Sequence, residues 1–353
     1  MMYKFQSEIQ FFYLYPMNIN TLAKSSFIML LLLFIYACKT DPKSEPVNPA
    51  IIESNDTLIL LDSLIQADVR NPDLYFDRAI YFKNKGLFPK AKADIYSALF
   101  IDSVNADFYM FAGDLFVDMG DGANAAALMS KGINMNPKNE DLYVKAIAYN
   151  YYLQRYEAAL NFTRDLIQLN KYNAEAYFFK GMIFKEINKE NEAISSFQTC
   201  IEVDPGFYNA HMQLGLLFSY DGDDLSVQYF ENALRLDENS REAMYAIAYH
   251  YQQKDEFNLA VKQYKKMVLL NSKDHEIFFN LGHCYIGLDS LNKAYKHFDL
   301  ATQIQPQYAG AYYMKGNLRE IQGNNSEALI NYQQALNMLP GDTTIINAIE
   351  RVN

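Results

Sequence analysis

A repeat of 34 residues constrains this 353-residue chain more than any other feature. The segments 174–207, 275–308 and 309–342 share one skeleton: an aromatic residue at position 4, Gly at 8, Ala at 20, an aromatic residue at 24, a small residue at 27, an aliphatic residue at 30 and Pro at 32. Small residues at positions 8 and 20 let two helices approach closely, and the proline ends the second helix. Units of this length bury their apolar faces only against one another, so the pattern predicts a stack of helix pairs.

The same register continues through most of the chain and divides it into eight units. The fifth unit has 33 residues, because one is missing near Asp223-Asp224 in the turn between its two helices, and Ser226 replaces the usual Ala at position 20. The units cover residues 72–105, 106–139, 140–173, 174–207, 208–240, 241–274, 275–308 and 309–342. Eight units in phase indicate an array in which each unit contacts only its neighbours.

This skeleton resembles the tetratricopeptide repeat, although position 4 carries Tyr, Phe, His or Met where that family has Trp. The resemblance implies an all-α, right-handed α-solenoid of about eight helix-turn-helix repeats over residues 72–342. Asp56–Val69, within residues 55–71, is amphipathic and is predicted to be a lone N-terminal capping helix. Thr343–Val352, within residues 343–353, is predicted to be a short C-terminal capping helix, because a bare end would expose the core of the array.

The N-terminal region carries an apolar run, Phe27–Ala37, preceded by Lys24. A membrane-spanning helix needs roughly 20 apolar residues, so this shorter run has the length of a signal-peptide core. It ends in Ile35-Tyr36-Ala37-Cys38, which resembles a bacterial lipobox. That resemblance implies cleavage before Cys38 and attachment of lipid to its thiol; the alternative is an uncleaved signal anchor with an incidental cysteine.

The N-terminal segments are assigned accordingly. Residues 1–37 are predicted to be a signal peptide whose translation starts at Met17, and residues 38–54 to be the lipidated cysteine and a flexible, proline-rich tether. Lys39 after the cysteine resembles a signal for sorting to the outer membrane. The resemblance therefore implies an outer-membrane lipoprotein, either facing the periplasm or exposed at the surface.

Charge and cysteine content argue against several functional classes. The chain has 31 Lys and Arg against 42 Asp and Glu, a net charge of −11, and no basic stripe, so no nucleic-acid partner is expected. Cys200 and Cys284 fall at core positions of the repeat, and no metal or cofactor motif is present. The run Asp221-Gly-Asp-Asp224 lacks the rest of a calcium loop and is interpreted as a solvated turn. No enzymatic activity and no cofactor are expected.

The first helix of each repeat lines a concave groove in the resembled family, with positions 2, 5, 9 and 12 facing inward. The rows at positions 5 and 9 are unusually apolar, which favours an extended or helical peptide with hydrophobic anchors and not the carboxylate clamp of chaperone-binding members. The candidate groove residues are Met110, Val144, Phe178, Met182, Met212, Leu216, Tyr245, Tyr249, Phe279 and Tyr313. The alternative is that these side chains pack against the neighbouring helix and leave little surface exposed.

Position 2 is acidic in most units and predicts an acidic rim beside the groove. The rim residues are Asp107, Asp141, Glu175, Glu242 and Glu276. Two interpretations stay open: the carboxylates complement the dipole at helix N-termini, or they steer a basic partner.

The function expected from these features is a membrane-anchored scaffold or adaptor of the bacterial cell envelope. It would bind a protein partner in the groove while a lipid on Cys38 holds the pair at the membrane. The alternative is an envelope lipoprotein that binds a small ligand or a glycan. The oligomeric state is left open.

Overall fold

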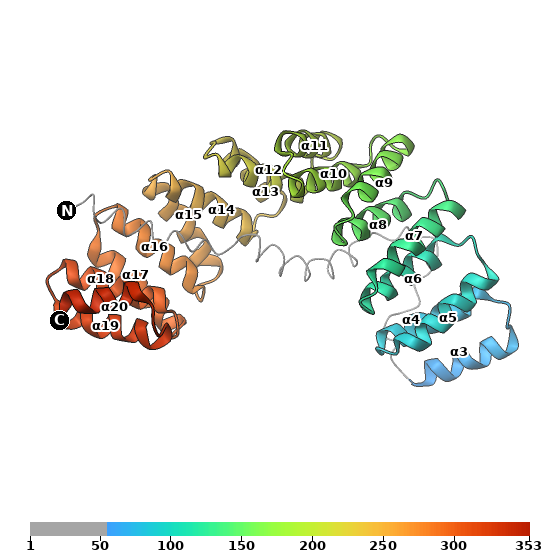
Figure 1. Ribbon diagram of the computed structural model, residues 1–353, viewed down its shortest axis with the longest axis horizontal. Helices are drawn as coiled ribbons and strands as arrows, with labels where there is room; N and C mark the ends of the chain where they lie inside the picture. Colours follow the sequence, from blue (N-terminus) through green and yellow to red (C-terminus); the bar gives the residue numbers. More distant parts are fainter. Residues whose placement is uncertain (1–54) are drawn as a thin grey trace. The chain divides into compact units, whose positions relative to one another are not determined.

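The computed structural model describes residues 55–353, which include eighteen α-helices and no strand (Figure 1). The chain divides between Leu64 and Ile65, and residues 65–353 form one compact unit. Cys38, the predicted signal peptide and the tether lie outside the described residues.

Each predicted repeat contains two antiparallel helices, here called helix A and helix B. The A helices are α4 (Pro72–Asn84), α6 (Ala106–Asp118), α8 (Glu140–Tyr152), α10 (Ala174–Glu186), α12 (Tyr208–Tyr220), α14 (Arg241–Gln253), α16 (His275–Gly287) and α18 (Ala309–Ile321). The B helices are α5 (Phe88–Ile101), α7 (Gly122–Met135), α9 (Tyr156–Leu169), α11 (Glu190–Val203), α13 (Leu225–Leu236), α15 (Phe257–Leu270), α17 (Leu291–Ile304) and α19 (Asn325–Met338). Every helix A contacts its own helix B, and each helix B contacts the next helix A, which confirms the predicted all-α solenoid.

Close approach of helix A to helix B depends on position 8. A Cβ atom added to Gly215 would lie 2.4 Å from the Phe230 ring, and one added to Gly282 would lie 2.5 Å from the Phe298 ring. Phe230 and Phe298 occupy position 24 and are completely buried. The glycine is therefore needed because the aromatic ring of helix B fills the space that a side chain on helix A would take.

Position 4 has a role that the apolar pattern does not reveal. The Tyr109 hydroxyl donates a hydrogen bond to the Ser103 carbonyl at 3.0 Å, and the Tyr177 hydroxyl donates to the Lys171 carbonyl at 3.2 Å. Tyr75 and Tyr143 make the equivalent bond. A tyrosine here fills the gap between units and also satisfies a carbonyl of the preceding turn, because its polar end reaches past its apolar ring.

The turn from helix A to helix B uses a left-handed residue at position 15 in every unit. Four units have glycine there, as at Gly120 with φ of 76°. The other four have Gln154, Asn188, Asp255 and Asp289, with φ of 57°, 57°, 58° and 52°. A residue with a Cβ atom is strained in the left-handed conformation, so glycine would be the more favourable residue in these four turns.

Helices were predicted at both ends of the repeat array, and the structure has a helix at each of these places. Helix α3 (Asn55–Ala67) begins one residue before the predicted helix and ends two residues earlier, and its Leu61 and Ile65 side chains are buried. Helix α20 (Thr343–Val352) has the predicted bounds and contacts α19. Asp342 caps α20 by accepting hydrogen bonds from the amides of Thr344 and Ile345, at 2.9 and 3.1 Å.

Candidate functional site

The side chains at positions 2, 5, 6, 9 and 12 of the A helices are here called the A-helix face. Helix α6 contacts α8, α8 contacts α10, and α12 contacts α14, so the A helices of these pairs of consecutive repeats adjoin directly. Parallel neighbouring helices bring equivalent positions into register, which places one residue of each row beside the next.

Four predicted groove residues belong to the core instead. Phe178 and Met182 are each 6% exposed and pack in a cluster with Phe197 and Cys200. Met212 is 7% exposed beside Phe230, and Tyr313 is 3% exposed. Their prediction as groove-lining side chains is wrong. Phe178, Met212 and Tyr313 at position 5 pack toward the aromatic residue at position 24 of their own unit, and Met182 at position 9 packs in the same cluster as Phe178.

The other six predicted groove residues keep part of their surface accessible. Met110, Val144, Leu216, Tyr245, Tyr249 and Phe279 are half-buried. The Phe279 ring lies 5.0 Å from the Tyr308 ring and 4.6 Å from the His283 ring, measured between centroids. These six residues form partly covered apolar surface, as the groove prediction expects. The alternative, packing against neighbouring helices, describes the four buried residues.

The predicted acidic rim contains side chains in three different environments. Asp107, Asp141 and Glu242 are exposed at the starts of their helices. Glu276 is half-buried and lies 2.9 Å from the Arg241 guanidinium. Glu175 is half-buried, and burial, together with the nearby charge of Asp141, raises the pKa of its carboxyl.

Ion pairs cross between A helices in the first half of the face. The Lys145 ammonium lies 2.7 Å from the Asp114 carboxylate, which also accepts a hydrogen bond from the Tyr149 hydroxyl. Lys83 lies 3.1 Å from Asp118 in the same arrangement. Each pair joins the helix A of one repeat to that of the next and neutralises a carboxylate on the face.

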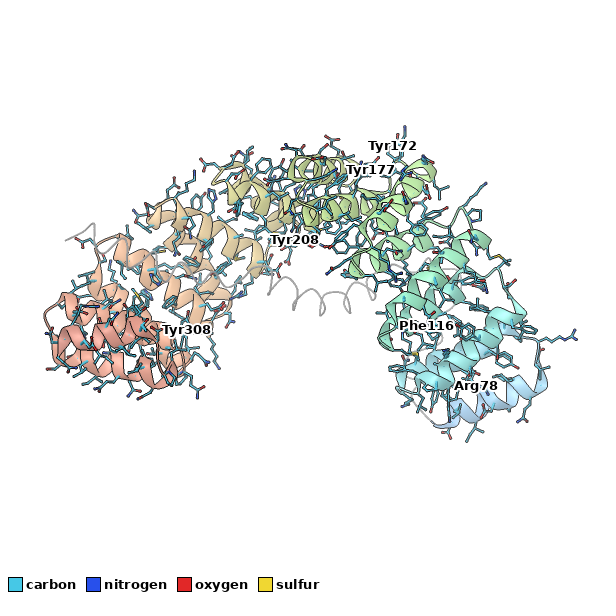
Figure 2. The ribbon with its side chains drawn as sticks, viewed as in Figure 1. Arg78, Phe116, Tyr172, Tyr177, Tyr208 and Tyr308 are labelled. Carbon is cyan, nitrogen blue, oxygen red and sulfur yellow. The ribbon has the colours of Figure 1, made fainter. Side chains whose placement is uncertain are left out.

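Aromatic side chains dominate the second half of the face. The Tyr245 and Tyr249 rings are nearly parallel, 9° apart with centroids 6.2 Å apart, and the Tyr245 hydroxyl accepts a hydrogen bond from the Asn280 amide at 3.0 Å. Burial raises the pKa of Tyr245 to about 12 and raises that of Tyr308, which is labelled in Figure 2. Burial also lowers the pKa of His283 to about 4. These three groups therefore stay uncharged at neutral pH.

Unit five carries a polar cluster that the repeat pattern alone did not identify. Ser226 at position 20 is completely buried, and its hydroxyl lies 2.9 Å from His250 Nδ1. His250 Nε2 lies 3.3 Å from Asp224, which also pairs with Lys254 at 3.2 Å. His250 stands at position 10 of unit six, where the other units have apolar residues, tyrosine or cysteine. The two unusual residues, Ser226 in unit five and His250 in unit six, were the sequence signal that could have predicted this contact.

The same cluster resembles a serine–histidine–aspartate arrangement, but its serine is inaccessible. Ser226 has no exposed surface, whereas Asp224 is 82% exposed at its side chain. A nucleophile must reach a substrate, so the pair is better explained as a hydrogen-bonded contact between units five and six.

The described cysteines behave as predicted for core residues. Cys200 and Cys284 are unpaired and completely buried, and burial raises the pKa of each thiol to about 12. Thiols of this kind are poor nucleophiles. Over residues 55–353, no three His, Cys, Asp or Glu side chains gather closely enough to hold a metal ion. None of the described helices combines the length and hydropathy needed to cross a bilayer.

Comparisons with known proteins identify the repeat. The family model for the tetratricopeptide repeat matches residues 174–207, 275–308 and 309–341. The crystal structure of the C-terminal part of a TPR repeat-containing protein from Cytophaga hutchinsonii superposes with a TM-score of 0.60 and 15% identity, covering 68% of this chain and 99% of that one. At this identity, the similarity establishes the fold alone.

Two curated relatives share sequence with parts of the chain. The general transcriptional corepressor ssn6 of Schizosaccharomyces pombe is 31% identical over 132 residues, which are 36% of this chain and 12% of that protein. A DnaJ homolog subfamily C member 7 homolog of Dictyostelium discoideum is 20% identical over 264 residues, which are 66% of this chain and 48% of that protein. The chain thus spans less than half the length of either relative. The family model thus identifies tetratricopeptide repeats at residues 174–207, 275–308 and 309–341, and the helix pairs show that these repeats belong to an α-solenoid that extends over residues 72–342.

Proposed function

We propose that this protein is a membrane-anchored scaffold of a bacterial cell envelope that holds a segment of a protein partner on its A-helix face. The observation that carries this proposal is the set of half-buried apolar side chains that recur on that face in α6, α8, α12, α14 and α16, from Met110 to Phe279. Partly covered apolar surface on a rigid array provides anchor sites with little loss of conformational entropy on binding. Repeat solenoids use such extended surfaces to bind proteins.

The membrane location follows from the N-terminal pattern. The short apolar run ending at Cys38 supports lipid attachment, with the outer membrane as the expected destination. Cys38→Ala should release the folded protein from membranes, because the buried acyl chains supply the anchoring free energy. Fractionation of cells checks this, and a Cys38→Ala protein that stays in the membrane fraction would exclude the anchor.

We also propose that the protein has no enzymatic activity and no nucleic-acid partner. Residues 72–342 are occupied by structural repeats, and the net charge of −11 opposes contact with phosphate backbones.

Crosslinked affinity capture from the native cells tests the scaffold. A face variant, Met110→Ser with Leu216→Ser and Tyr249→Ser, removes three half-buried anchors. The matched control, Phe100→Ser with Leu269→Ser, removes apolar side chains that are 90% and 87% exposed on B helices. Circular dichroism establishes that both variants are folded. Loss of one captured protein in the face variant alone supports the proposal; equal capture by both variants contradicts it.

A small ligand or glycan is the second candidate, favoured by one observation. The nearly parallel rings of Tyr245 and Tyr249 lie beside Asn280 and Arg241, which combines an aromatic platform with polar groups. A ligand that remains bound after protease digestion of the captured material, and is lost in Tyr249→Ser, would favour this candidate.

A further inference from the structure

We propose that the partner segment is basic and extended, with Lys or Arg side chains that pair with an unpaired acidic row on the first four A helices and apolar side chains that contact the half-buried row beside it. The unpaired acidic row consists of Asp73, Asp77, Asp107, Asp141 and Glu175. This inference rests on the proposed function and adds the chemistry of the partner and its place on the face.

The row differs from the other carboxylates on these helices, each of which has a side-chain partner: Glu140 accepts hydrogen bonds from the amides of Asn170 and Asn173, and Glu186 accepts one from the Tyr151 hydroxyl. Asp114 and Asp118 each pair with a lysine of a neighbouring helix A. Within residues 55–353, none of the five carboxylates of the row forms an ion pair with a side chain of this chain. The face therefore holds a line of negative charge that the fold itself leaves without counter-charge.

Helix N-termini do not account for the whole row, although Asp73, Asp107, Asp141 and Glu175 each stand in the first turn of a helix. The dipole of a helix stabilises a carboxylate near its N-terminus and would lower the pKa. The pKa of Glu175 is instead raised, first by burial and then by Asp141, and the pKa of Asp77 is raised by burial and by Asp73. Asp77 also lies a full turn inside α4, beyond the reach of the terminal dipole. Like charges thus repel one another here, and a basic partner would relieve that repulsion.

Apolar surface lies next to the row. Phe76, Met110, Val144 and Phe179 are half-buried at positions 5 and 6 of the same four helices. Phe76 packs against Phe108 and Phe111, with ring centroids 5.0 and 5.2 Å apart, so it is held in place by its neighbours. A segment on this surface would meet both carboxylates and apolar side chains, which favours a partner with basic and apolar side chains over a purely charged one.

The spacing of the row limits the sequence of the partner. Asp107, Asp141 and Glu175 recur once per helix A on helices that are in contact, and packed helices lie about 8–10 Å apart. A polyproline-type chain rises about 3.1 Å per residue and has three residues per turn, so every third residue recurs at about 9 Å on the same edge. The partner is therefore expected to carry a basic residue at every third position.

Peptide binding to the purified full-length protein tests this inference. The probe is a fluorescein-labelled peptide of four Lys-Leu-Pro triplets, compared with its Glu-Leu-Pro counterpart and with a peptide of the same composition whose lysines are adjacent. Fluorescence anisotropy should show binding of the Lys-Leu-Pro peptide at least about tenfold tighter than that of either control peptide, and weaker at high salt. Equal affinity for the Lys and Glu peptides would overturn the charge assignment, and equal affinity for the adjacent-lysine peptide would overturn the spacing.

Two variants of equal net charge locate the site. The row variant carries Asp107→Asn, Asp141→Asn and Glu175→Gln; the control variant carries Asp165→Asn, Glu202→Gln and Glu231→Gln, three exposed positions on B helices. We expect about a tenfold loss of peptide affinity in the row variant and less than a twofold change in the control. Equal losses in both would overturn the inference, since they would show an effect of net charge alone.

The same row variant separates this inference from the scaffold function. If the cellular partner is lost in the Met110, Leu216 and Tyr249 variant but retained in the row variant, the scaffold stands and the basic chemistry of the partner is wrong. If neither variant loses a partner, the A-helix face is not the binding surface and both proposals fail.

Discussion

The two halves of the A-helix face differ in chemistry although they share one backbone. In α4 to α10, carboxylates recur along the face, and lysines such as Lys83 and Lys145 bridge neighbouring helices. In α12 to α18, tyrosine, phenylalanine and histidine replace most of the charge, as in the group of Tyr245, Phe279 and His283. The repeat therefore specifies where a side chain lies, while the residue type at each position decides what the surface can bind.

The difference separates two physical kinds of recognition. Charge on the first half acts over distance and weakens with salt. Aromatic surface on the second half acts only on contact, through removal of apolar area from water. A partner that spans both halves would be steered by the first and anchored by the second.

The largest expected effect comes from removing a buried aromatic ring from the core of the second half. Phe298→Ala should lower the free energy of unfolding by about 3–5 kcal/mol, because the ring is completely buried and contacts Phe279. Hydrogen exchange should show lost protection in α16 to α19 and unchanged protection in α4 to α9, since repeats contact only their neighbours. A uniform loss along the array would show that the two halves unfold as one unit.

Acid should act oppositely on the two halves. The pKa of His283 is about 4 when folded and near 6.5 when unfolded, so its stabilising contribution is present above pH 6.5 and is lost as the pH falls toward 4. Between pH 7 and pH 5, protonation of His283 should lower the free energy of unfolding of the second half by about 2 kcal/mol. Glu175 has a raised pKa in the folded state, so its contribution to the stability of the first half is present at low pH and is lost as the pH rises.

Hydrogen exchange at pH values from 4 to 7, corrected for intrinsic rates, measures this difference. His283→Leu should remove the acid sensitivity of α16, and Glu175→Gln should remove the opposite trend in α10. Parallel pH profiles for the two helices in the unmodified protein would contradict the assignment.

The contact between units five and six lies within the second half, close to its start. Ser226→Ala should cost about 1–2 kcal/mol, because His250 Nδ1 would lose its buried hydrogen-bond partner. The double variant Ser226→Ala with His250→Leu restores residue types found in other repeats and should be more stable than Ser226→Ala. Urea unfolding compares the variants, and an equal loss in both would mean that the pair does not act together.

The smallest effect should be identical in the two halves. Gln154→Gly in the first half and Asp289→Gly in the second should each stabilise the protein by a few tenths of a kcal/mol up to about 1 kcal/mol, since both residues have a left-handed backbone. Urea unfolding measures the change. Unequal gains would indicate that the turns, and not only the surfaces, differ between the halves.

Much of the fold was predictable because the signal is repeated. Each helix A begins at the first residue of a unit defined by the 34-residue period, and α20 has the bounds expected from its amphipathic pattern. The tyrosine hydroxyl bonds at position 4 were missed, because an apolar pattern treats Tyr109 as a ring and ignores its polar end.

The candidate site was less predictable. Met110 and Phe178 occupy the same position of the second and fourth repeats, but the first is half-buried and the second belongs to the core. Burial at this position depends on the side chains contributed by the neighbouring helices, and the repeat pattern of one unit does not contain them.

By itself, the sequence determined the period, the number of units, the positions that need a small residue and the excess of negative charge, because each of these depends on residue type and spacing along the chain. Only the tertiary structure decided which position-5 side chains reach solvent, which carboxylates find a lysine on the next helix, and that Ser226 and His250 meet. These properties are contacts between residues that are far apart in the chain, and such contacts are set by the packing of one repeat on the next.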